Sequence, residues 1–533
     1  DKFGEDTFRI IEEEPERLAE IRGITTRKAM DISTQLEEKK DMRDVMIFLQ
    51  GYGISPTLST KIFNNYGTRV YDIIKTNPYQ LADDVTGIGF KTADEIARRA
   101  GVEVNASVRI KSGMCYALTE ASLSGHTYLP KEKMVETTIN LLGLRDQYLN
   151  ADGTYNMELL DNCFTELVLE KKLILKEIDG NQAVFLSTFY YTELNIARML
   201  LELNISTPED DYILGVKMDT VEDMSGIHLD DLQRQAVVAT QNNGVSIITG
   251  GPGTGKTTTI NAIIQLFESD GLEVSLAAPT GRAAKRMTEA TGHEAKTIHR
   301  MLEISGGQSD DPELDAKFGR NEQNPLETDV VIVDEMSMVD TFLMHAFLKA
   351  VTVGTRLVFV GDVNQLASVG PGNVLKDIIE SECFKVVRLT KVFRQAGESG
   401  IVTNAHKINN GEMIELKPNP KGDFFFTERN DDQSIADTIL MFCNKNLPTY
   451  YKLDKFRDIQ VLAPQRKGTI GINNLNSKLQ ATLNPNPICL KDGDKEYRIG
   501  DKIMQIKNNY EKDVFNGDIG YVDFFDKESE QLF

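Results

Sequence analysis

Apolar positions follow different periods in different parts of the chain. In the N-terminal part they fall on one face of short segments that glycine and proline interrupt, which predicts a helical region. The segment LILKEIDGNQAVFLS has two apolar-rich stretches around Asp179 and Gly180, a pattern typical of a β-hairpin. Farther along, the apolar run Val245–Thr249 predicts a short buried strand, and the apolar spacing from Ile260 to Phe267 predicts a helix.

The N-terminal region contains an internal repeat. One constant offset aligns Phe3, Gly4, Ile10, Ile11, Pro15 and Leu18 with Tyr66, Gly67, Ile73, Ile74, Pro78 and Leu81. After one inserted residue, the alignment continues with Gly23, Ile24 and Ala29 matched to Gly87, Ile88 and Ala93. Each copy predicts a helix, a break at proline, a short helix, a glycine-containing hairpin and another helix. The sharpest hairpin is TGIGFKTADEIARRAG, and a looser one is QGYGISPTLSTKIFNNYG.

The hydrophobic-glycine-hydrophobic-glycine turn of these hairpins resembles the helix-hairpin-helix module. The resemblance implies contact with a DNA phosphate, because glycine permits close backbone approach and a helix N-terminus attracts anions. The candidate contacts are Gly87, Gly89 and Lys91, with Arg98 and Arg99 as additional charge. A structural hairpin with a solvated basic face is the alternative for one copy. Tandem copies favour phosphate binding, although such modules also serve as scaffolds and protein contacts.

The next part of the chain shows a different pattern. Amphipathic stretches at Lys131–Leu142 and Leu159–Leu169 precede the hairpin around Asp179. Helices followed by a hairpin predict a winged-helix-like unit, and a plain packing domain fits the same pattern equally well. The polar, acidic segment 206–231 has the composition of a linker.

A phosphate-binding motif follows the strand at Val245–Thr249. GGPGTGKT lies between a predicted strand and a predicted helix, which is the context that a P-loop requires. Glycines let backbone N–H groups wrap the phosphates, Lys256 neutralises β/γ charge, and the Thr257 hydroxyl binds Mg²⁺. The predicted nucleotide-binding residues of this loop are Gly251, Pro252, Gly253, Thr254, Gly255, Lys256, Thr257 and Thr258.

Two further strands end in polar residues that suit nucleotide hydrolysis. VVIVDE is an apolar strand that ends in Asp334, suited to the Mg²⁺ shell, and Glu335, suited to activating the attacking water. RLVFVGDVNQL is another strand, followed by Gln365, which is placed to sense the γ-phosphate. An ordinary exit from a strand into a loop is the alternative for Gln365.

Eight segments in a fixed order resemble those of superfamily 1 helicases, and most closely the RecD-like branch in its long form with an N-terminal extension. They are LQRQAV, GGPGTGKTTT, AAPTGRAAKRM, TIHRML, VIVDEMSMVD, VGDVNQLASVGPGNVL, LTKVFRQA and VLAPQRKGTIGINNLNSKLQ. The resemblance spans the whole chain and includes the repeated hairpins. It implies a multidomain fold with a helical region and a winged-helix-like unit, then two RecA-like α/β motor domains with a partial SH3-like β-barrel insertion.

The predicted domains follow from the patterns and the resemblance together. They are a tandem helix-hairpin-helix region at 1–110, a winged-helix-like domain at 111–205, a linker at 206–231, RecA-like motor domain 1 at 232–390, an incomplete RecA-like motor domain 2 at 391–490 and the start of an SH3-like insertion at 491–533. Within motor domain 1, the segment 303–327 fits either a strand-separating pin hairpin or an irregular loop.

The resemblance also assigns roles by position. Gln233 reads the adenine edge, with Gln235 near enough to confuse that assignment. Arg394 joins Lys256, Asp334, Glu335 and Gln365 as a catalytic residue, because an arginine can stabilise charge on the transferred phosphoryl oxygens; a surface ion pair is its alternative. The positions implied to line the single-strand path are Pro279, Thr280, Gly281, Arg282, Thr297, His299, Pro464, Gln465 and Asn473. For His299, a packed side chain is the alternative.

Composition and charge limit the function further. The formal net charge is −22, which argues against a basic coat on duplex DNA, although a nucleic-acid groove is a local feature. The five cysteines lack zinc-site spacing, which indicates reduced thiols in a cytoplasmic protein. No apolar run has the length of a membrane-spanning helix. The chain starts without Met and lacks the family's later motifs after Gln505, so we expect a partial chain with reduced ATP turnover.

Together these features predict an ATP- and Mg²⁺-dependent DNA helicase or translocase that moves on single-stranded DNA in repair or recombination. The resemblance implies 5′-to-3′ movement. We expect single strands, single-strand/duplex junctions and DNA-repair proteins as partners of a monomer. An ATP-switched DNA-binding scaffold is the main alternative, and a subunit of a RecD-type nuclease complex is another. A small-molecule P-loop kinase does not explain AAPTGR, GDVNQL and VFRQ together.

Overall fold

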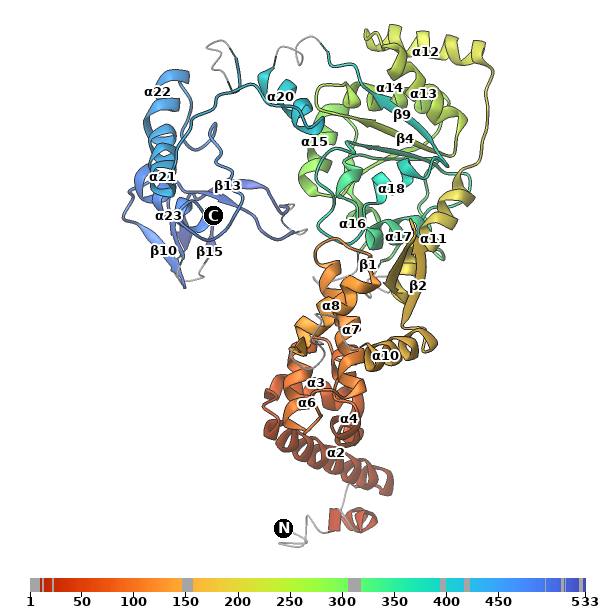
Figure 1. Cartoon of the computed structure of the whole chain (residues 1–533), viewed down its shortest axis with the longest axis vertical. Helices are drawn as coiled ribbons and strands as arrows, with labels where there is room; N and C mark the ends of the chain where they lie inside the picture. The colour runs from red at the N-terminus through yellow and green to blue at the C-terminus, as the bar shows by residue number, and fades with distance from the viewer. Residues whose placement is uncertain are drawn as a thin grey trace. The chain divides into compact units, whose positions relative to one another are not determined.

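The computed structural model describes residues 10–11, 14–21, 24–145, 157–304, 318–393, 399–416, 422–493, 495–509, 512, 514–526 and 531–533. The chain divides into two compact units, Asp1–Leu194 with Val369–Gly372, and Asn195–Ser368 with Asn373–Phe533. Figure 1 labels many of the helices and strands of both units. Of the helices described, none combines the length and the apolar character needed to cross a bilayer.

The repeated N-terminal region is helical. Its elements are η2 (Pro15–Glu20), α2 (Thr26–Gly51), α3 (Pro56–Tyr66), η3 (Gly67–Arg69), α4 (Val70–Thr76), α5 (Gln80–Asp84) and α6 (Phe90–Arg99). Equivalent positions of the two copies are buried: Leu18 and Leu81 are 3% and 0% exposed, and Ala29 and Ala93 are fully buried. The repeat in the sequence is therefore also a repeat of packing.

Two glycine hairpins join the helices of this region. Gly53, with φ of +80°, follows α2, and Gly87, with φ of +100°, follows α5. Both turns require the left-handed conformation that glycine adopts without steric cost. Ile54 and Ile88, one residue after each glycine, are 5% and 3% exposed, so an apolar anchor fixes each hairpin to the core.

A basic side chain from each half of the region holds the hairpin of the other half. The Arg99 guanidinium donates to the Tyr52 carbonyl oxygen at 2.7 Å. The Lys61 amino group donates to the Thr86 carbonyl oxygen at 3.2 Å. Arg99, which the sequence offered as additional charge for DNA, is therefore used in packing the first hairpin.

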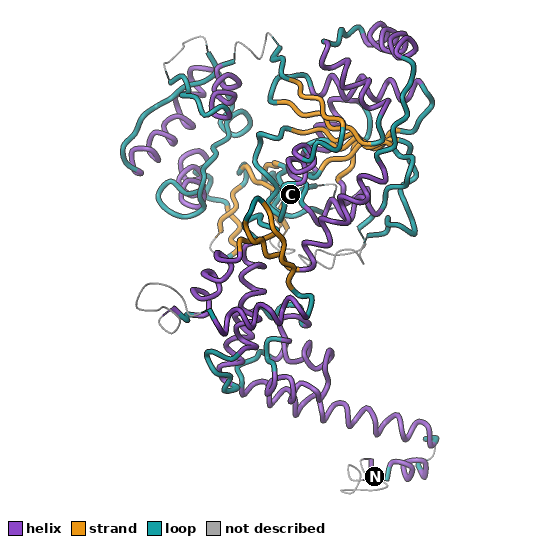
Figure 2. The backbone as a smooth tube through the Cα atoms, turned by 45° about the vertical axis from the view of Figure 1, so that its right-hand side comes forward, coloured by secondary structure: helices purple, strands orange, loops and turns teal. Residues whose placement is uncertain are grey.

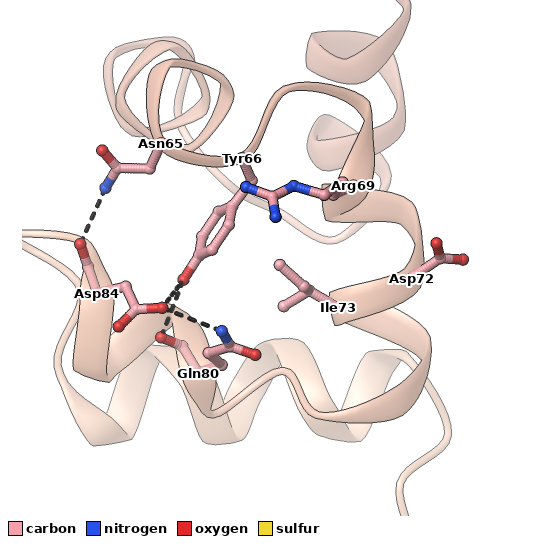
Figure 3. Close-up of a pocket in the computed structure, with 7 residues that line it drawn as sticks. All are labelled: Asn65, Tyr66, Arg69, Asp72, Ile73, Gln80 and Asp84. Carbon is pink, nitrogen blue, oxygen red and sulfur yellow. Dashed lines mark hydrogen bonds between the residues drawn. The ribbon is translucent and has the colours of Figure 1, made fainter.

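A polar cluster fastens the end of α3 to α5, the short helix before the second hairpin (Figure 3). The Tyr66 hydroxyl donates to Asp84 Oδ2 at 2.5 Å, and the Gln80 side-chain amide donates to the same oxygen at 3.1 Å. Burial and the hydrogen bond to Asp84 raise the pKa of Tyr66. The three side chains and Arg69 line a pocket of about 610 Å³. Since the cluster bonds mainly to itself, it fixes the position of α5.

The second half of this unit has the element order predicted for a winged-helix-like domain. It contains α7 (Ser107–Ser122), β1 (Tyr128–Pro130), α8 (Lys131–Leu142), α10 (Glu158–Leu169), β2 (Leu173–Ile178) and β3 (Asn181–Leu186). The strands form an antiparallel sheet in the order β1-β3-β2. Asp179 and Gly180 form the predicted turn between β2 and β3, both with positive φ as a tight hairpin requires.

The boundary predicted at residue 110 does not separate two cores. One continuous hydrophobic cluster runs from Val45 in α2 to Val184 in β3. Across it, Arg109 on α7 forms a bidentate pair with Asp94 on α6, at 2.8 and 3.0 Å. Arg109 also donates to the Leu142 carbonyl oxygen. The two predicted domains are therefore one packed body in the described residues, because their apolar faces cover each other.

The second unit is built on a six-stranded parallel sheet, visible in Figures 1 and 2. Its strands lie in the order β6-β5-β7-β8-β4-β9, and every neighbouring pair is parallel. They are β4 (Val245–Gly250), β5 (Val274–Ala278), β6 (Ala295–Thr297), β7 (Val330–Val333), β8 (Arg356–Gly361) and β9 (Lys385–Leu389). This is the α/β motor domain that the sequence predicts.

Helices that precede or connect these strands cover both faces of the sheet. They are α11 (Ser187–Leu203), α12 (Asp211–Ser225), α13 (Asp231–Asn242), α14 (Lys256–Ser269), α15 (Gly281–Thr291), α16 (Ile298–Met301), η5 (Met336–Met338), α17 (Thr341–Lys349) and α18 (Val374–Glu380). Alternate residues of β7 enter opposite cores: Val331 and Val333 pack on one face, and Val330 and Ile332 on the other. A strand buried on both faces reads as a continuous apolar run, which is why the sequence predicted it.

The prediction of a linker at 206–231 is partly wrong. Helix α12 occupies most of it and buries Met218 and Val221 in one core of the motor domain. The composition is polar because the outer face and ends of α12 are solvated, while a few apolar residues provide the packing. Similarly, the winged-helix-like domain does not extend to residue 205, since Ile196, Leu200 and Leu203 of α11 belong to the other motor core.

The insertion at 303–327, for which a pin hairpin and an irregular loop were the alternatives, is described only at its base. Ile304 and Phe318 form an antiparallel bridge, and Arg320 bonds to Glu303 at 2.8 Å. Residues 305–317 lie outside the described part of the chain. The pin therefore stays a prediction.

The second RecA-like sheet is not formed in the described part of 391–490. This segment contains α20 (Gly400–Asn409), α21 (Asp432–Met441), η6 (Phe442–Asn446), α22 (Leu447–Tyr451) and α23 (Ile472–Leu483), and the first strand described in it is β10, which starts at Cys489. Just before Pro464, Leu462 is 89% exposed, so this apolar stretch is not packed into a sheet.

The last part of the chain forms short antiparallel pairs, as expected for the start of a small barrel. The strands are β10 (Cys489–Asp492), β11 (Lys495–Arg498), β12 (Lys502–Met504), β13 (Ile519–Tyr521), β14 (Phe525–Asp526) and β15 (Gln531–Leu532). The buried carboxylate of Asp501 accepts hydrogen bonds from Gln480 and Asn484, two residues at the end of α23. Helix α23 is therefore part of the same body as these strands.

Replacement of Arg109 by Met tests the shared core of the first unit. We expect the free energy of opening of α6 and α7 to fall by about 3 kcal/mol, because Asp94 would lose its buried partner. Burial acts to raise the pKa of Asp94, but bonds from Arg109 and Tyr79 outweigh it and hold the pKa below its usual range. The stabilisation is therefore present at neutral pH and lost as pH falls through that lowered value. Hydrogen–deuterium exchange of the intact chain measures it.

The control is Lys133→Ala, which removes an exposed pair with Glu136. This variant should change the same opening free energy by less than about 0.5 kcal/mol. Equal protection of α6 and α7 in the Arg109→Met variant and the wild type would show that the two predicted domains pack independently.

Candidate active site

The P-loop forms where β4 leaves the sheet. All six residues of β4 are buried, and the chain turns directly into α14. Gly253 and Gly255 have φ of +76° and +81°, which other residues rarely adopt. A Cβ on Gly250 would lie 2.9 Å from the Leu389 carbonyl oxygen of β9, so this position also requires glycine. The motif therefore folds as the sequence predicts, between a strand and a helix.

The polar side chains of the loop bond to its own backbone. The Lys256 amino group donates to the Gly250 and Gly251 carbonyl oxygens at 2.6 and 3.3 Å. The hydroxyl of Thr254 donates to the Gly251 carbonyl oxygen at 2.8 Å. Thr257 and Thr258 lie in the first turn of α14, and Pro252 is exposed at the tip. The structure thus brings together all eight residues of the predicted phosphate loop.

Gln233 lies beside the loop, but both ends of its side chain are already bonded. Its amide oxygen accepts from the Asp230 N–H at 3.0 Å in a capping box, and its amide nitrogen donates to the Gly255 carbonyl oxygen at 3.3 Å. The residue is 1% exposed, whereas Gln235 is exposed. In this arrangement Gln233 positions the P-loop, and reading an adenine edge would require these bonds to rearrange.

An ion-pair network fixes the start of α13 against α12. Arg234 bonds to Glu222 on α12 at 2.7 and 2.9 Å and to Asp219 at 2.9 Å. The hydrogen bond from Arg234 lowers the pKa of Glu222 to about 2. The network keeps Gln233 against the P-loop. Neither a motif nor a spacing indicated it, because its acidic partners lie in the predicted linker.

Residues that follow β9 form another wall of the loop. The Phe393 N–H donates to the Gly253 carbonyl oxygen at 3.2 Å. A Cβ on Gly255 would lie 2.9 Å from the Phe393 ring, and a Cβ on Gly251 would lie 2.7 Å from the His406 ring. No motif or spacing in the sequence indicates a role for Phe393 or His406. The next residue, Arg394, lies outside the described residues, so its position and its role as an arginine finger stay predictions.

Asp334 and Glu335 lie at the end of β7 on the same edge of the sheet as the P-loop. Burial raises the pKa of Asp334, and burial followed by repulsion from Asp334 raises the pKa of Glu335, while Lys256 and Arg286 act in the opposite direction on both. Glu335 has φ of +55°, a left-handed conformation that costs energy for a residue with a Cβ. Strain and raised pKa values at neighbouring carboxylates are typical of a functional site.

The donor set at this edge suits a hard divalent cation. Mg²⁺ prefers oxygen ligands and binds through one or two carboxylates together with substrate phosphates. The Asp334 carboxylate and the Thr257 hydroxyl are oxygen donors on the two elements that border the phosphate loop. They are the residues that would hold the ion.

Gln365 lies in the loop that follows β8, between β7 and β4 in the sheet order. The Gln365 side chain is exposed, and the Gln365 backbone N–H donates to the Asp362 carbonyl oxygen at 3.0 Å. The Thr249 hydroxyl accepts from the Val363 N–H at 3.3 Å, which connects this loop to the end of β4. Gln365 is therefore free to reorient on a loop that is anchored to the strand before the P-loop.

The residues predicted to contact DNA in motor domain 1 lie at carboxyl ends of β5 and β6. Pro279 and Thr280 lead into α15, where Gly281 is buried and Arg282 is exposed. The Thr280 hydroxyl accepts from the Ala283 N–H at 3.2 Å as the N-cap of α15. Thr280 thus has a structural role already, and Arg282 is the exposed cation next to it.

Thr297 and His299 have packing roles in the described structure. Thr297 is 4% exposed, and its hydroxyl caps α16 by accepting from the Arg300 N–H. The His299 ring lies 6.2 Å from the Phe318 ring, and burial lowers its pKa. For His299, the structure therefore agrees with the alternative of a packed side chain.

The remaining predicted contacts are exposed. Pro464, Gln465 and Asn473 surround a compact loop before and at the start of α23, in which the Gln465 carbonyl oxygen accepts from the Ile472 N–H. In the first unit, Gly87, Gly89 and Lys91 are exposed at the second hairpin, and Gly89 caps α6 without a side-chain bond.

Replacement of Glu335 by Gln tests the electrostatics of this edge. A raised folded-state pKa means that ionised Glu335 destabilises the fold at neutral pH, so the neutral variant should be more stable there. We expect a gain of less than about 1 kcal/mol, because water screens a partly exposed pair. The gain should shrink as pH falls through the raised pKa. Thermal unfolding at several pH values measures it, with exposed Glu294→Gln as the control that should show no gain.

Three family descriptions match consecutive parts of the chain. Residues 38–128 match the ATP-dependent RecD2 DNA helicase HHH domain, residues 228–419 match the AAA domain, and residues 475–533 match the ATP-dependent RecD-like DNA helicase SH3 domain. The last match begins at 475 rather than at the predicted 491, in agreement with the bonds between α23 and Asp501.

Several proteins are similar to this chain. The ATP-dependent RecD2 DNA helicase of Deinococcus radiodurans is 30% identical over 527 residues, which cover 98% of this chain and 69% of that protein. The RecBCD enzyme subunit RecD of Buchnera aphidicola is 31% identical over 54% of this chain and 58% of its own length. A crystal structure of Pif1 helicase from Candida albicans covers 57% of this chain and 70% of its own, at 23% identity and a TM-score of 0.31, which is too low to support an argument about the fold.

The match to the Deinococcus protein extends over nearly the whole chain and 69% of that relative, and three matched domains occur in the order that the sequence resemblance implied. The expected resemblance is confirmed, and the chain belongs to the long-form RecD-like family of DNA helicases.

Proposed function

We propose that this chain is an ATP-dependent motor that moves on single-stranded DNA and unwinds duplex DNA ahead of it. One observation carries the proposal: the P-loop and the two acidic residues after β7 lie at one edge of one parallel sheet, and Lys256 acts electrostatically on both acids. A loop for phosphates beside paired carboxylates is the equipment for hydrolysing a nucleoside triphosphate.

Each residue at this edge has a role that its chemistry allows. The backbone N–H groups of the loop and the Lys256 amino group would bind the phosphates, and Thr257 and Asp334 would hold Mg²⁺. When bound, the ion neutralises charge on the phosphate oxygens. Glu335 would orient the attacking water and accept its proton. The raised pKa of Glu335 makes it a better base near neutral pH than an ordinary carboxylate.

Coupling of hydrolysis to movement would pass through the loop after β8 and the segment after β9. Gln365 is exposed on a loop tied to β4 through the Thr249 hydroxyl. Phe393, immediately before Arg394, bonds to the P-loop backbone. A change at the phosphates would therefore reach both segments directly, and Gln365 and Arg394 are the residues that we expect to respond to the γ-phosphate.

The path of the DNA strand would follow the loops at the carboxyl ends of β5 and β6. Arg282, Lys285 and Arg286 of α15 line one pocket together with the acidic Glu289 and Asp518, so cations are in local excess beside the proposed path of this overall acidic chain. We propose 5′-to-3′ movement and a role in repair or recombination from the family resemblance. The exposed hairpin at Gly87 would add a phosphate contact on duplex DNA or at a junction.

Measurement of ATP hydrolysis with and without oligo-dT tests the motor proposal. We expect oligo-dT to stimulate turnover in the wild type, and Lys256→Ala and Glu335→Gln each to lower the stimulated rate by about 100-fold or more, as loss of a group that stabilises the transition state does. Exposed Lys385→Ala is the matched control and should hydrolyse ATP at the wild-type rate. Stimulated hydrolysis would then be followed by a strand-displacement assay on substrates with 5′ and 3′ tails.

The outcomes separate the motor from the scaffold. Tight binding of ATP and single-stranded DNA without stimulated turnover would favour an ATP-switched DNA-binding scaffold. An ATP hydrolysis rate that is the same with and without oligo-dT would contradict both proposals and indicate a P-loop enzyme of another kind.

The DNA path predicts a modest salt dependence. We expect Arg282→Ala to weaken binding to oligo-dT and to reduce the slope of log affinity against log salt concentration by about one contact, as loss of a phosphate ligand does. Fluorescence anisotropy across a salt series measures the slope, with Lys385→Ala as the control. A wild-type slope that indicated many phosphate contacts would contradict a path confined to a few strand-end loops.

A further inference from the structure

A histidine outside the recognised motifs lies directly against the P-loop. His406 is on α20, and its ring approaches Gly251 so closely that a Cβ there would lie 2.7 Å from Cε1 and 3.4 Å from Nε2. Only a glycine leaves room for this contact. Neither the phosphate-binding role of the loop nor its fold explains why an imidazole should occupy the space.

The Nε2 atom of this imidazole is buried and has no hydrogen-bond partner among the described residues. A buried polar atom without a partner costs free energy, so its presence in a native structure calls for an explanation, such as a catalytic role, water or a bound ion. Here the atom lies at a loop whose proposed ligand is an anion. An Nε2–H is a donor, which is the group that a phosphate oxygen accepts.

Hydrogen bonds within its own segment brace helix α20, which carries His406. The side chain of Asn404, 4% exposed, donates to the Glu415 carbonyl oxygen at 3.1 Å and accepts from the Glu415 N–H at 2.9 Å. The Ser399 hydroxyl caps the start of the helix by accepting from the Val402 N–H. The histidine is thus carried by a helix whose start and middle are stabilised by hydrogen bonds.

The neighbours of Gly251 indicate which end of the nucleotide His406 would meet. The Gly251 carbonyl oxygen accepts from the amino group of Lys256, the side chain that serves the β- and γ-phosphates in a P-loop. The opposite part of the loop, at Gly255, is covered by Gln233 and Phe393. His406 therefore lies on the side of the terminal phosphates.

We propose that His406 is a phosphate-binding residue whose Nε2–H donates a hydrogen bond to the terminal phosphate of bound nucleoside triphosphate. The inference rests on the proposed function, because it needs the P-loop to bind ATP. It adds a specificity-determining residue: a diphosphate lacks the group that His406 contacts, so α20 distinguishes the two nucleotides. Since α20 follows the segment that carries Phe393, the contact also joins this part of the chain to the state of the nucleotide.

The test compares the affinities of two nucleotides for the intact chain. Fluorescent mant-AMPPNP and mant-ADP, each with Mg²⁺, are titrated into the wild type, His406→Ala and His406→Gln. We expect His406→Ala to weaken mant-AMPPNP binding by about tenfold or more, the loss expected for one hydrogen bond to a charged group, and to leave mant-ADP binding within about twofold. Gln places an amide N–H near the position of Nε2, so His406→Gln should recover most of the affinity.

Two controls separate binding from folding. His293→Ala removes an imidazole that is paired with Glu268 elsewhere on the motor domain, and it should bind both nucleotides as the wild type does. Thermal unfolding without nucleotide reports whether either His406 variant is destabilised. If His406→Ala is destabilised, recovery of triphosphate affinity in His406→Gln still supports the contact. If His406→Gln has the melting temperature of the wild type but does not recover the affinity, the proposal is overturned.

Unchanged mant-AMPPNP affinity in His406→Ala would overturn the proposal while leaving the proposed function intact. Equal losses for mant-AMPPNP and mant-ADP would also overturn it, because they would mean that the ring only packs the loop. Failure of the wild type to bind either nucleotide would instead overturn the proposed function, and this inference with it.

Discussion

The burial of β4 between β8 and β9 is the constraint on which the site depends. Every residue of β4 is buried, and its backbone is paired on both sides. The chain can leave such a strand only at the edge of the sheet, and it must turn at once to begin α14. The loop that results has Gly253 and Gly255 in left-handed conformations and leads into a helix N-terminus, where free N–H groups attract anions.

The other parts of the site are placed by the same sheet. Because all strands are parallel, β7 and β8 end at the edge where β4 ends, and their terminal residues meet the loop there. The acidic pair after β7 is partly removed from water and strained at Glu335, so the fold maintains a costly arrangement. The walls of the loop come from outside the strand ends: Gln233 from α13, Phe393 from the segment after β9, and His406 from α20.

In the first unit, one hydrophobic core is shared by the helical repeat and the winged-helix-like part. The helical repeat and the winged-helix-like part share apolar faces, and the Arg109–Asp94 pair crosses between them. Mutual bonds from Arg99 and Lys61 hold the two glycine hairpins. A rigid support of this kind would suit the proposed phosphate contact of the hairpin, since N–H groups on a mobile loop would lose the benefit of pre-organisation.

Local pattern in the sequence determined the elements that local physics controls. The apolar strands, the glycine turns and the P-loop depend on residues close together in the chain, so period and spacing predicted them correctly, as they predicted the Asp179-Gly180 turn and the acidic ends of β7. The order of motifs determined the family, because eight segments in sequence are far more specific than any one of them.

Only the tertiary structure decided which residues from distant segments share a surface. No local pattern indicates that Gln233 is bonded at both ends, that Arg234 reaches acids in a segment with the composition of a linker, or that His406 lies on Gly251. The same limit explains the errors in the predicted linker and in the boundary at residue 205: a few buried apolar residues of α12 and α11 outweigh the polar average of their segments. Packing and pairing are properties of the assembled chain, and a sequence specifies them only through contacts that it does not display.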